Sequence, residues 1–500
     1  IAIYTPPTLQ KLITTSVVED KKKGLWIGTN AGIVYFNTGT QQSVAYKADK
    51  KRANWLKDNY INNLMIDNQD NLWISTFNVL QMVSLKTNQF RSYSGDMAGS
   101  DYMEHIYTLV RKNKTEIFCT GTDGLYTAHL ETGSTKRIAG SATLGLVHHI
   151  EKIEENCWLV SADDGMFEYN PASGHISQQS LLQKFPEWNA CRNNYFNTAY
   201  RKGDVWYWAS EEREGLVKWD RRNHTLQKFK AGTADSKGLT ENHIRNIKTD
   251  REGFLWVLSD ATLSKFDMTK DSVVEVLYFK NNKNAPNASL YFDMYDDGST
   301  LWFASYGAGL CGYDKKRKDW RFINELDGLC NNSVYSILPE NDSVFWVSTN
   351  MGLSRVNHFT RLCSNYFHED GLQDNSFDEK GGLIFDNKLL FGGINGFTAV
   401  DLKKRQDNDI DFPVFIHYVE YYADNQKFSI RKLNWDKLNL PNGTNSIEVF
   451  LSALTFAENH KIKFSYKIEG IHKDYIETGN SNSIILNALD YGTYHISIGY

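Results

Sequence analysis

Short apolar runs alternate with polar turns along the whole chain, and no stretch has the spacing of a long amphipathic helix. Residues 332–337 (Asn-Ser-Val-Tyr-Ser-Ile) are typical, because apolar and polar side chains alternate as they do in a half-buried β-strand. Turns rich in Asp, Asn and Gly separate the runs, as at 250–253 and 296–298, and their Gly can supply the positive φ that closes a hairpin. The pattern predicts an all-β fold.

One pattern occurs nine times, at intervals of 40 to 49 residues. Each unit contains a first strand, a turn, a second strand with a large ring, a Gly-containing turn and two further strands. Four antiparallel strands per unit are typical of a propeller blade, whereas a solenoid would show helix pairs. A ring at the same place in each blade is expected to fill the wedge between adjacent sheets, burying roughly 150–250 Å². The rings are Trp26, Trp73, Phe118, Trp158, Tyr207, Trp256, Trp302, Trp346 and Phe391.

The repeat is most distinctive between residues 323 and 397, where it includes Asn-Ser-Val-Tyr-Ser-Ile at 332–337 and Phe-Trp-Val-Ser-Thr-Asn-Met-Gly-Leu at 345–353. It resembles the blade unit of the periplasmic sensor regions of Bacteroidetes hybrid two-component systems, whose units read approximately Asn-x-Val-x-x-Ile-x-x-Asp-x-x-Gly-x-Leu-Trp-Ile-Gly-Thr-x-x-Gly-Leu. The segment from residue 412 is similar to the Ig-like domain with regularly spaced tyrosines that follows the propellers in those sensors. Four positions depart from the family pattern: Phe118 and Phe391 in place of Trp, Thr262 in place of Gly, and Tyr475 in place of Trp.

The resemblance implies two seven-bladed propellers, and so fourteen units where this chain has nine. Counting seven units back from Phe391 reaches Phe118. We therefore expect the last two blades of an incomplete first propeller at 1–92. A second, seven-bladed propeller is expected at 93–411, and a truncated Ig-like β-sandwich at 412–500.

Charge and cysteine content exclude several classes of function. Lys and Arg total 55 against 60 Asp and Glu, so the clustered basic surface that nucleic acid requires is not expected. The six cysteines form no CxxC pair and no zinc-ligand spacing, so neither a metal nor a cofactor is predicted. Cys119 and Cys157 lie inside strand-like runs and are expected to be buried free thiols.

The chain carries no apolar segment of 18 residues, and its first ten residues, IAIYTPPTLQ, lack the charged start and apolar stretch of a signal peptide. Any membrane tether is therefore expected outside these residues. The resemblance implies that the chain lies in the periplasm, as the ectodomain of an inner-membrane protein.

Catalytic motifs are scarce. A glycosidase needs two carboxylates at a defined separation, and acidic turn residues do occur, at 211, 212 and 214 in one unit and at 163 and 164 in another. Charged turns are usually just solvated, and the sequence contains no G-x-S-x-G, H-E-x-x-H or Walker motif. His148 and His149 are neighbours on one strand and so point to opposite faces, which argues against a metal pair. No catalytic residue is predicted.

Ligand-binding groups are expected in the turns after the ring-bearing strands and in the connections into each next blade, which open on one face of a propeller. Planar rings suit the apolar face of a sugar, and Asn, Arg or Glu suit its hydroxyl and acid groups. The candidates are Trp188, Arg192, Asn194, Tyr195, Glu211, Arg213, His243, Arg245, Tyr306, Asn332 and Asn350.

The leading hypothesis is a non-catalytic ectodomain that senses a glycan-derived oligosaccharide. As the resemblance implies, the Ig-like domain would pair as a homodimer and pass the signal to a transmembrane histidine kinase that controls polysaccharide utilisation. Two alternatives from other classes stay open at this point. One is a glycan-cleaving propeller enzyme, a glycosidase or lyase, and the other is a protein-interaction scaffold.

Overall fold

The structure, a computed structural model, describes residues 7–48, 56–85, 89–94, 101–212, 214–232, 237–279, 285–404, 414–424, 426–432, 435, 437–453, 462, 464–478, 481–487 and 490–499. The chain divides into two compact units, residues 88–406 and residues 1–87 with 407–500. Both units are built from antiparallel sheets, which confirms the all-β prediction.

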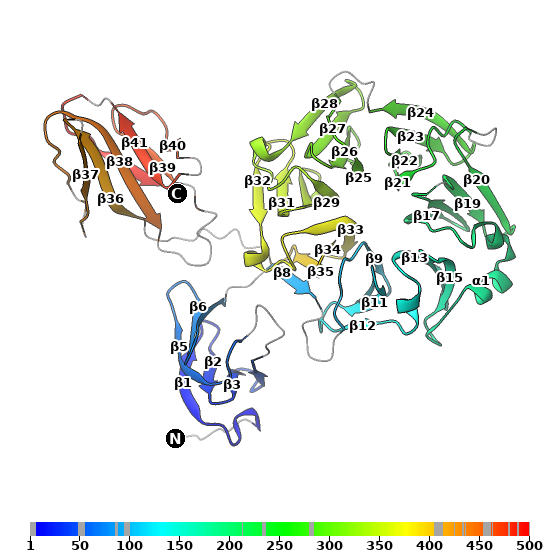
Figure 1. Cartoon of the computed structure of the whole chain (residues 1–500), viewed down its shortest axis with the longest axis horizontal. Coiled ribbons are helices and arrows are strands. Elements are labelled where there is room, and N and C mark those ends of the chain that lie inside the picture. The colour runs from blue at the N-terminus through cyan, green and yellow to red at the C-terminus, as the bar shows by residue number, and fades with distance from the viewer. Residues whose placement is uncertain are drawn as a thin grey trace. The chain divides into compact units, whose positions relative to one another are not determined.

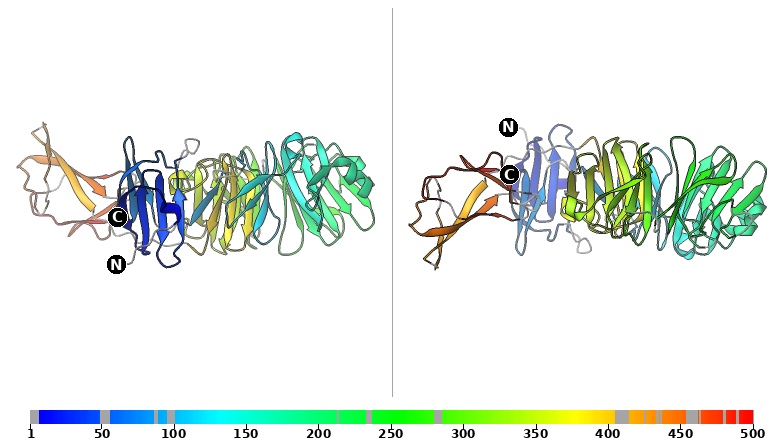
Figure 2. Two further views of the ribbon diagram at one scale, coloured as in Figure 1. Left: turned by 90° about the horizontal axis from the view of Figure 1, so that it is seen from below. Right: turned by 90° about the horizontal axis from the view of Figure 1, so that it is seen from above.

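The unit of residues 88–406 is a propeller, in which the described residues form seven four-stranded sheets around a common axis (Figure 1). In the side views, its strands run from one face of the ring to the other (Figure 2). The strands are β8 (Phe90–Tyr93), β9 (Thr108–Arg111), β10 (Glu116–Gly121), β11 (Gly124–His129), β12 (Thr135–Arg137), β13 (Val147–Glu154), β14 (Cys157–Ala162), β15 (Gly165–Asn170), β16 (His175–Ser177), β17 (Thr198–Lys202), β18 (Val205–Ala209), β19 (Leu216–Asp220), β20 (Thr225–Phe229), β21 (Ile244–Thr249), β22 (Leu255–Ser259), β23 (Thr262–Asp267), β24 (Ser272–Tyr278), β25 (Tyr291–Asp296), β26 (Thr300–Ser305), β27 (Leu310–Asp314), β28 (Asp319–Ile323), β29 (Val334–Asn341), β30 (Val344–Thr349), β31 (Gly352–Asn357), β32 (Cys363–Tyr366), β33 (Phe377–Phe385), β34 (Lys388–Gly393) and β35 (Gly396–Asp401), with one short helix, α1 (Gln178–Lys184). The strands nearest the axis are β9, β13, β17, β21, β25, β29 and β33 (Figure 1).

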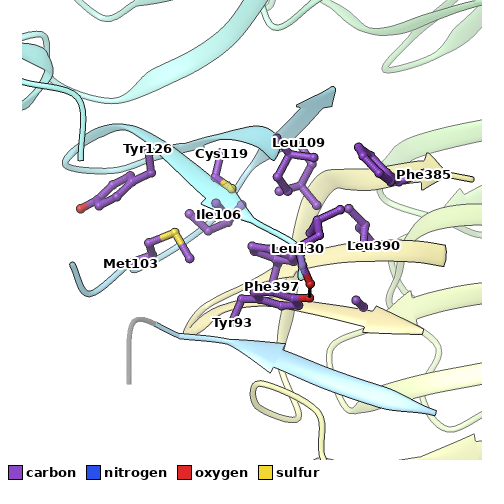
Figure 3. Close-up of a cluster of buried hydrophobic side chains, with 13 residues drawn as sticks. Tyr93, Met103, Ile106, Leu109, Cys119, Tyr126, Leu130, Phe385, Leu390 and Phe397 are labelled. Carbon is purple, nitrogen blue, oxygen red and sulfur yellow. Dashed lines mark hydrogen bonds between the residues drawn. The ribbon is translucent and has the colours of Figure 1, made fainter. Parts of the chain in front are cut away.

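The last sheet of the ring joins the two ends of the propeller. β33, β34 and β35 come from the C-terminal end, and β8 from the N-terminal end completes the sheet by pairing with β35. The ring of Tyr93 stacks on Phe397, and its hydroxyl donates to the carbonyl oxygen of Leu130, 2.6 Å away (Figure 3). The domain boundary predicted at residue 93 falls inside β8, because alternation identifies a strand without showing which sheet it joins.

Acidic residues fold the turn before the ring-bearing strand. One oxygen of Asp250 accepts the backbone N–H groups of Glu252 and Phe254, and its other oxygen accepts the indole N–H of Trp256 at 2.9 Å. Asp297 holds Trp302 in the same way at 2.9 Å. The turn that the sequence shows as Asp-rich is therefore tied to the ring of its own sheet.

Glycine is required where the second hairpin of a sheet meets its fourth strand. Gly352 has φ of 102°, and a Cβ there would lie 2.4 Å from the carbonyl oxygen of Tyr366. Gly396 has φ of 91°, and its Cβ would lie 2.0 Å from the carbonyl oxygen of Tyr93. A side chain at either position would meet backbone, so the repeated Gly follows from close packing.

The repeated rings fill the wedges between sheets, but Trp158 does not occupy the predicted place. Trp346 lies three residues before Thr349, which pairs with Gly352 at the end of the hairpin. Trp158 lies four residues before Ala162, which ends the corresponding hairpin. Because successive side chains on a strand point to opposite faces, Trp158 faces the preceding sheet and packs against Phe118, with ring centroids 4.9 Å apart.

Phe391 is displaced by one residue in the other direction. It lies two residues before Gly393, which ends its hairpin, and packs in the cluster around Trp346 of the preceding sheet. Leu159 and Leu390 take the equivalent place on the opposite face. The expectation of a ring at the same place in each blade is therefore wrong for Trp158 and Phe391, because the hairpin sets the register independently of where the largest side chain falls.

Two further sheets lie between residues 14 and 84 and share a buried cluster that includes Ile33, Ile61 and Leu72. Trp26 packs against this cluster and donates its indole N–H to Asp20. The strands are β1 (Thr14–Glu19), β2 (Gly24–Thr29), β3 (Gly32–Asn37) and β4 (Ser43–Tyr46) in one sheet, and β5 (Ile61–Ile66), β6 (Asn71–Thr76) and β7 (Leu80–Ser84) in the other.

The C-terminal residues form a four-stranded and a three-stranded sheet that share one core, in which Val419 and Leu451 meet Ile468. That they form an Ig-like domain stays a prediction. The strands are β36 (Val414–Ala423), β37 (Gln426–Ile430), β38 (Thr444–Ala453) and β41 (Ser483–Asn487) in the first sheet, and β39 (Ser465–Ile468), β40 (Ile476–Glu477) and β42 (Ile496–Gly499) in the second.

Candidate functional site

Four innermost strands of the propeller carry a β-bulge after their first residue. A bulge leaves one residue out of the ladder and can redirect its side chain, which is why bulges often lie beside functional sites. The residues concerned are His148 on β13, Arg245 on β21, Phe292 on β25 and Tyr335 on β29.

A larger bulge interrupts β33, where pairing jumps from Phe377 to Gly382. Lys380, within this bulge, has φ of 59°, a left-handed conformation that is uncommon for a residue with a side chain. The next residue must be glycine, because a Cβ on Gly381 would lie 2.8 Å from the backbone of Gly392. The bulge removes Asp378, Glu379 and Lys380 from regular pairing with β34.

Charged side chains from three sheets meet near the propeller axis. Lys380 of the bulge forms an ion pair with Glu211, which follows β18. The guanidinium of Arg245 lies 3.7 Å from Glu211 and also binds Asp260 at 2.8 Å. His243 approaches the second oxygen of Asp260 at 3.1 Å. We call Glu211, Arg245, Glu379 and Lys380 the axial cluster.

The carboxylates of this region differ in their tendency to ionise. Burial by itself opposes ionisation of Glu211, but the attraction of Lys380 and Arg245 outweighs it and holds the pKa of Glu211 below its ordinary value. Burial raises the pKa of Glu379, and repulsion from Glu211 adds to that rise. Burial also raises the pKa of Asp378, although His105 lies 3.2 Å away and opposes the shift. The site therefore combines a stabilised carboxylate with two that resist ionisation.

Aromatic rings border the axial cluster. The imidazole of His148 stacks on the ring of Tyr195, with centroids 3.9 Å apart and planes 7° from parallel. Burial lowers the pKa of His148, even though its Nε2 lies 2.8 Å from Asp163. The stacking covers one face of each ring, so a sugar could pack its apolar face only against the outer side of this pair.

The structure brings some of the predicted site residues together. Tyr195, Glu211, His243 and Arg245 lie in or beside the axial cluster. Trp188 does not: its ring is fully buried among Trp208 and other core rings between two sheets, so it cannot face a ligand. Arg213 lies outside the described residues.

The other predicted residues serve turns or lie exposed. Asn332 has a turn role, because its carbonyl oxygen accepts the N–H groups of Gly307 and Gly309. Asn350 accepts from the hydroxyl of Ser376 at 3.2 Å. Tyr306 is 47% exposed, Arg192 is exposed and Asn194 is half-buried.

Lys380, Glu379, Asp378, Asp260 and His148 were not among the predicted ligand-binding residues. A signal for the first three exists in the sequence: residues 378–381, Asp-Glu-Lys-Gly, interrupt the apolar alternation of an innermost strand. The interruption shows that the strand is irregular. It does not show that Lys380 meets Glu211, which lies 169 positions away in the chain.

Three further observations concern the described part of the chain. It contains no group of three or more His, Cys, Asp or Glu side chains placed to hold a metal ion. Its helices include none with the length and apolar character needed to cross a membrane. A pocket within residues 20–85 is lined by Trp26 and Asp20, whose polar groups already bind one another.

Residues 56–78 match a family model described as the two component regulator propeller. The chain is also similar to histidine kinase P4 of Formosa agariphila, with 20% identity over 308 residues, which is 58% of this chain and 22% of that protein. The match contains β5 and β6 of the second N-terminal sheet and ends before β7.

The fold is similar to the extracellular domain of a protein described as a hybrid two component system from B. thetaiotaomicron. The TM-score is 0.73 at 18% identity, over 97% of this chain and 65% of that structure. The chain thus spans less than two thirds of the length of either protein. These findings confirm the resemblance to two-component sensor ectodomains that the repeat indicated.

Proposed function

We propose that this chain is a ligand-sensing, non-catalytic part of a periplasmic ectodomain, tethered to the inner membrane by other segments of a hybrid two-component sensor. The ligand is an oligosaccharide derived from a complex glycan. Its binding at the axial cluster is relayed to a histidine kinase that controls polysaccharide utilisation. The fold similarity to an extracellular two-component domain and the match to a histidine kinase support this assignment.

The observation that carries the proposal is the convergence of charged and aromatic side chains on the propeller axis. Glu211 and Arg245 come from two sheets, Lys380 from a third, and the stacked pair of His148 and Tyr195 lies beside them. Carboxylates accept hydrogen bonds from sugar hydroxyls, guanidinium and ammonium groups donate them, and rings pack on apolar sugar faces. A few convergent polar groups beside aromatic surface are typical of small-molecule sites.

A calorimetric or thermal-shift screen against size-defined oligosaccharides tests the proposal, because a ligand that binds only the native state raises the melting temperature. The Tyr195→Ala variant should lose the ring platform and bind the hit at least tenfold more weakly. Tyr278→Ala is the matched control, since Tyr278 is an exposed tyrosine on the outer strand β24. Equal affinity in both variants would place the ligand elsewhere, and a screen without hits would favour a protein-interaction scaffold.

Signal transfer, in this proposal, uses a homodimer formed through the C-terminal sandwich. A ligand can shift such an equilibrium only if it binds the two arrangements with different affinity. Gel filtration with multi-angle light scattering, with and without the ligand, measures the oligomeric state. A strict monomer under both conditions at high protein concentration would contradict the dimer.

A glycan-cleaving enzyme is the second candidate, favoured by one observation. The pKa of Glu379 is raised by burial, whereas attraction to cations holds the pKa of Glu211 low, and two carboxylates that differ in this way are typical of acid and base pairs. Incubation with a panel of polysaccharides, followed by an assay for new reducing ends or unsaturated products, distinguishes the candidates. Turnover that disappears in Glu379→Gln would replace the sensing proposal with the enzymatic one.

A further inference from the structure

Glu211 is held in the way that a protein holds an anionic ligand. Its carboxylate pairs with Lys380 of the β33 bulge and lies 3.7 Å from the guanidinium of Arg245, which belongs to β21. Only 16% of the Glu211 side chain is exposed, and 13% and 15% of the two cations. The contact with Lys380 is a charge-assisted hydrogen bond, which is among the stronger kinds in proteins, more so where water is excluded.

The side chains of Arg245 and Lys380 are oriented by contacts other than those with Glu211. Asp260 binds Arg245 at 2.8 Å through the guanidinium Nε and fixes the direction of the fork. Lys380 is directed by a left-handed backbone at φ of 59°, and Gly381 beside it leaves no room for a Cβ. Both orientations depend on residues outside the sheet that carries Glu211, so Glu211 does not set either of them.

The charge balance near the axis decides which ligands the site can accept. Among the described residues in and directly around the axial cluster, the permanent cations are Lys380 and Arg245, and the carboxylates are Glu211, Glu379, Asp260 and Asp378. Within the described residues, Glu379 makes no ion pair with either cation, although both attract it. Histidines 105, 148 and 243 each lie within 3.2 Å of a carboxylate. A further anion would therefore meet more carboxylates than permanent cations among these described side chains.

We infer that Lys380 and Arg245 form an anion-binding site that the chain fills with its own Glu211, so that the axial cluster takes uncharged sugars and rejects acidic ones. Uronate or sulfate groups would have to displace Glu211 from both cations and lie beside Glu379. A neutral sugar needs no displacement, because its hydroxyls can donate to the carboxylates and accept from the cations. The sugar class rests on the proposed function, whereas the filled anion site does not.

The experiment removes the internal anion and asks whether an external one takes its place. Glu211→Gln keeps the shape of the side chain without the charge, and Glu211→Ala also leaves space. The matched control is Glu214→Gln, because Glu214 lies three residues further on and likewise pairs with two lysines, Lys228 and Lys230, away from the cluster. Sodium sulfate and glucuronate are the probes, titrated against the melting temperature and by calorimetry at constant ionic strength.

We expect saturable binding of glucuronate to both Glu211 variants, at least tenfold tighter than to the wild-type chain or to Glu214→Gln. Replacing Lys380 by Met in the Glu211→Gln background should abolish that gain. Glucuronate binding to the wild-type chain as tight as to the variants would overturn the inference. The inference would also fail if a Glu211 variant that still melts cooperatively bound glucuronate no more tightly than the wild-type chain does.

Size-matched neutral and uronate oligosaccharides, titrated against the wild-type chain, separate this inference from the proposed function. Preference for the neutral series supports both. Tighter binding of the uronate series would contradict the inference and leave the sensing function standing. If neither series binds, the sensing function fails, and the anion measurements on the Glu211 variants still decide whether Lys380 and Arg245 form the site.

Discussion

The ring of Tyr93 lies flat on the ring of Phe397, with centroids 4.4 Å apart and planes 5° from parallel, although the two residues come from opposite ends of the propeller (Figure 3). Both are fully buried, and they face each other across the pairing of β8 with β35. A propeller keeps its edges protected only while its ring is closed. This contact is therefore part of what holds the ring together.

Replacing Tyr93 by Ala should destabilise the propeller by about 3–5 kcal/mol, the range for removing a large buried aromatic side chain. The change leaves a cavity beside Phe397 and removes the hydrogen bond to the carbonyl oxygen of Leu130. Urea denaturation followed by tryptophan fluorescence measures the loss. Tyr93→Phe keeps the ring and should cost only about 1 kcal/mol, the contribution of one hydrogen bond. Equal losses in the two variants would assign the effect to the hydroxyl.

Asp297→Ala should lower the free energy of unfolding by about 1–3 kcal/mol, because the indole N–H of buried Trp302 loses its acceptor. The backbone N–H of Thr300 loses the same partner. Chemical denaturation of this variant beside Asp342→Ala gives the comparison, since Asp342 has an exposed carboxylate. A loss in Asp342→Ala as large as in Asp297→Ala would contradict the role of the turn.

The same aspartate should contribute to acid unfolding. Burial opposes ionisation of Asp297, but hydrogen bonds from Trp302 and Thr300 hold its pKa below the ordinary value. A carboxyl with a lower pKa in the folded state stabilises above the unfolded pKa of about 4, and that contribution is lost as the pH falls from there through the folded pKa. Stability measured between pH 6 and pH 2 should fall less steeply in Asp297→Asn than in the wild-type chain.

Glu379→Gln should raise the melting temperature at pH 7 by roughly 1–3 °C while weakening ligand binding. Burial raises the pKa of Glu379 in the folded state, so its ionised form opposes folding at neutral pH. That penalty disappears as the pH falls through the raised folded pKa and then the unfolded one. The gain should therefore vanish near pH 4, and a gain that persisted there would have another cause.

The buried thiols should be chemically inert in the native protein. Cys119, Cys157, Cys191 and Cys311 are free and buried, and burial raises the pKa of Cys157 to about 11 and that of Cys311 to about 12. Because the thiolate is the reactive form, these four should not react with a thiol reagent at pH 8 until the chain unfolds. Titration with Ellman's reagent before and after addition of guanidinium counts them. Rapid modification of all six cysteines in the native state would contradict the buried positions.

The repeat could be detected from the sequence because each sheet must alternate side chains between two neighbours. Alternation identified the strands, and repetition of the four-stranded unit gave the period of 40 to 49 residues and the ring-bearing positions, such as Trp302 and Trp346. The turn before each ring could also be anticipated from its Asp and Gly, since those residue types satisfy turn backbone locally.

Register and pairing were decided by the tertiary structure. Trp158 and Phe391 carry the expected rings but face the other way, because the neighbouring hairpin determines which residues pair. β8 joins the last sheet because closure of the ring leaves the outer edge of β35 to be paired. A strand pattern is local, whereas the identity of a partner strand depends on the whole chain.

The candidate site shows the same division. Tyr195, Glu211 and Arg245 could be named from the sequence because turn and entry positions of a propeller share one face. Lys380 could not, because its direction comes from a bulge and its partner from a different sheet. Local alternation and turn chemistry thus determined the strands and the class of fold. The electrostatic character of the axis arises only when closure of the ring brings Lys380 and Arg245 to one carboxylate, since Coulomb attraction depends on distance in space and not on separation along the chain.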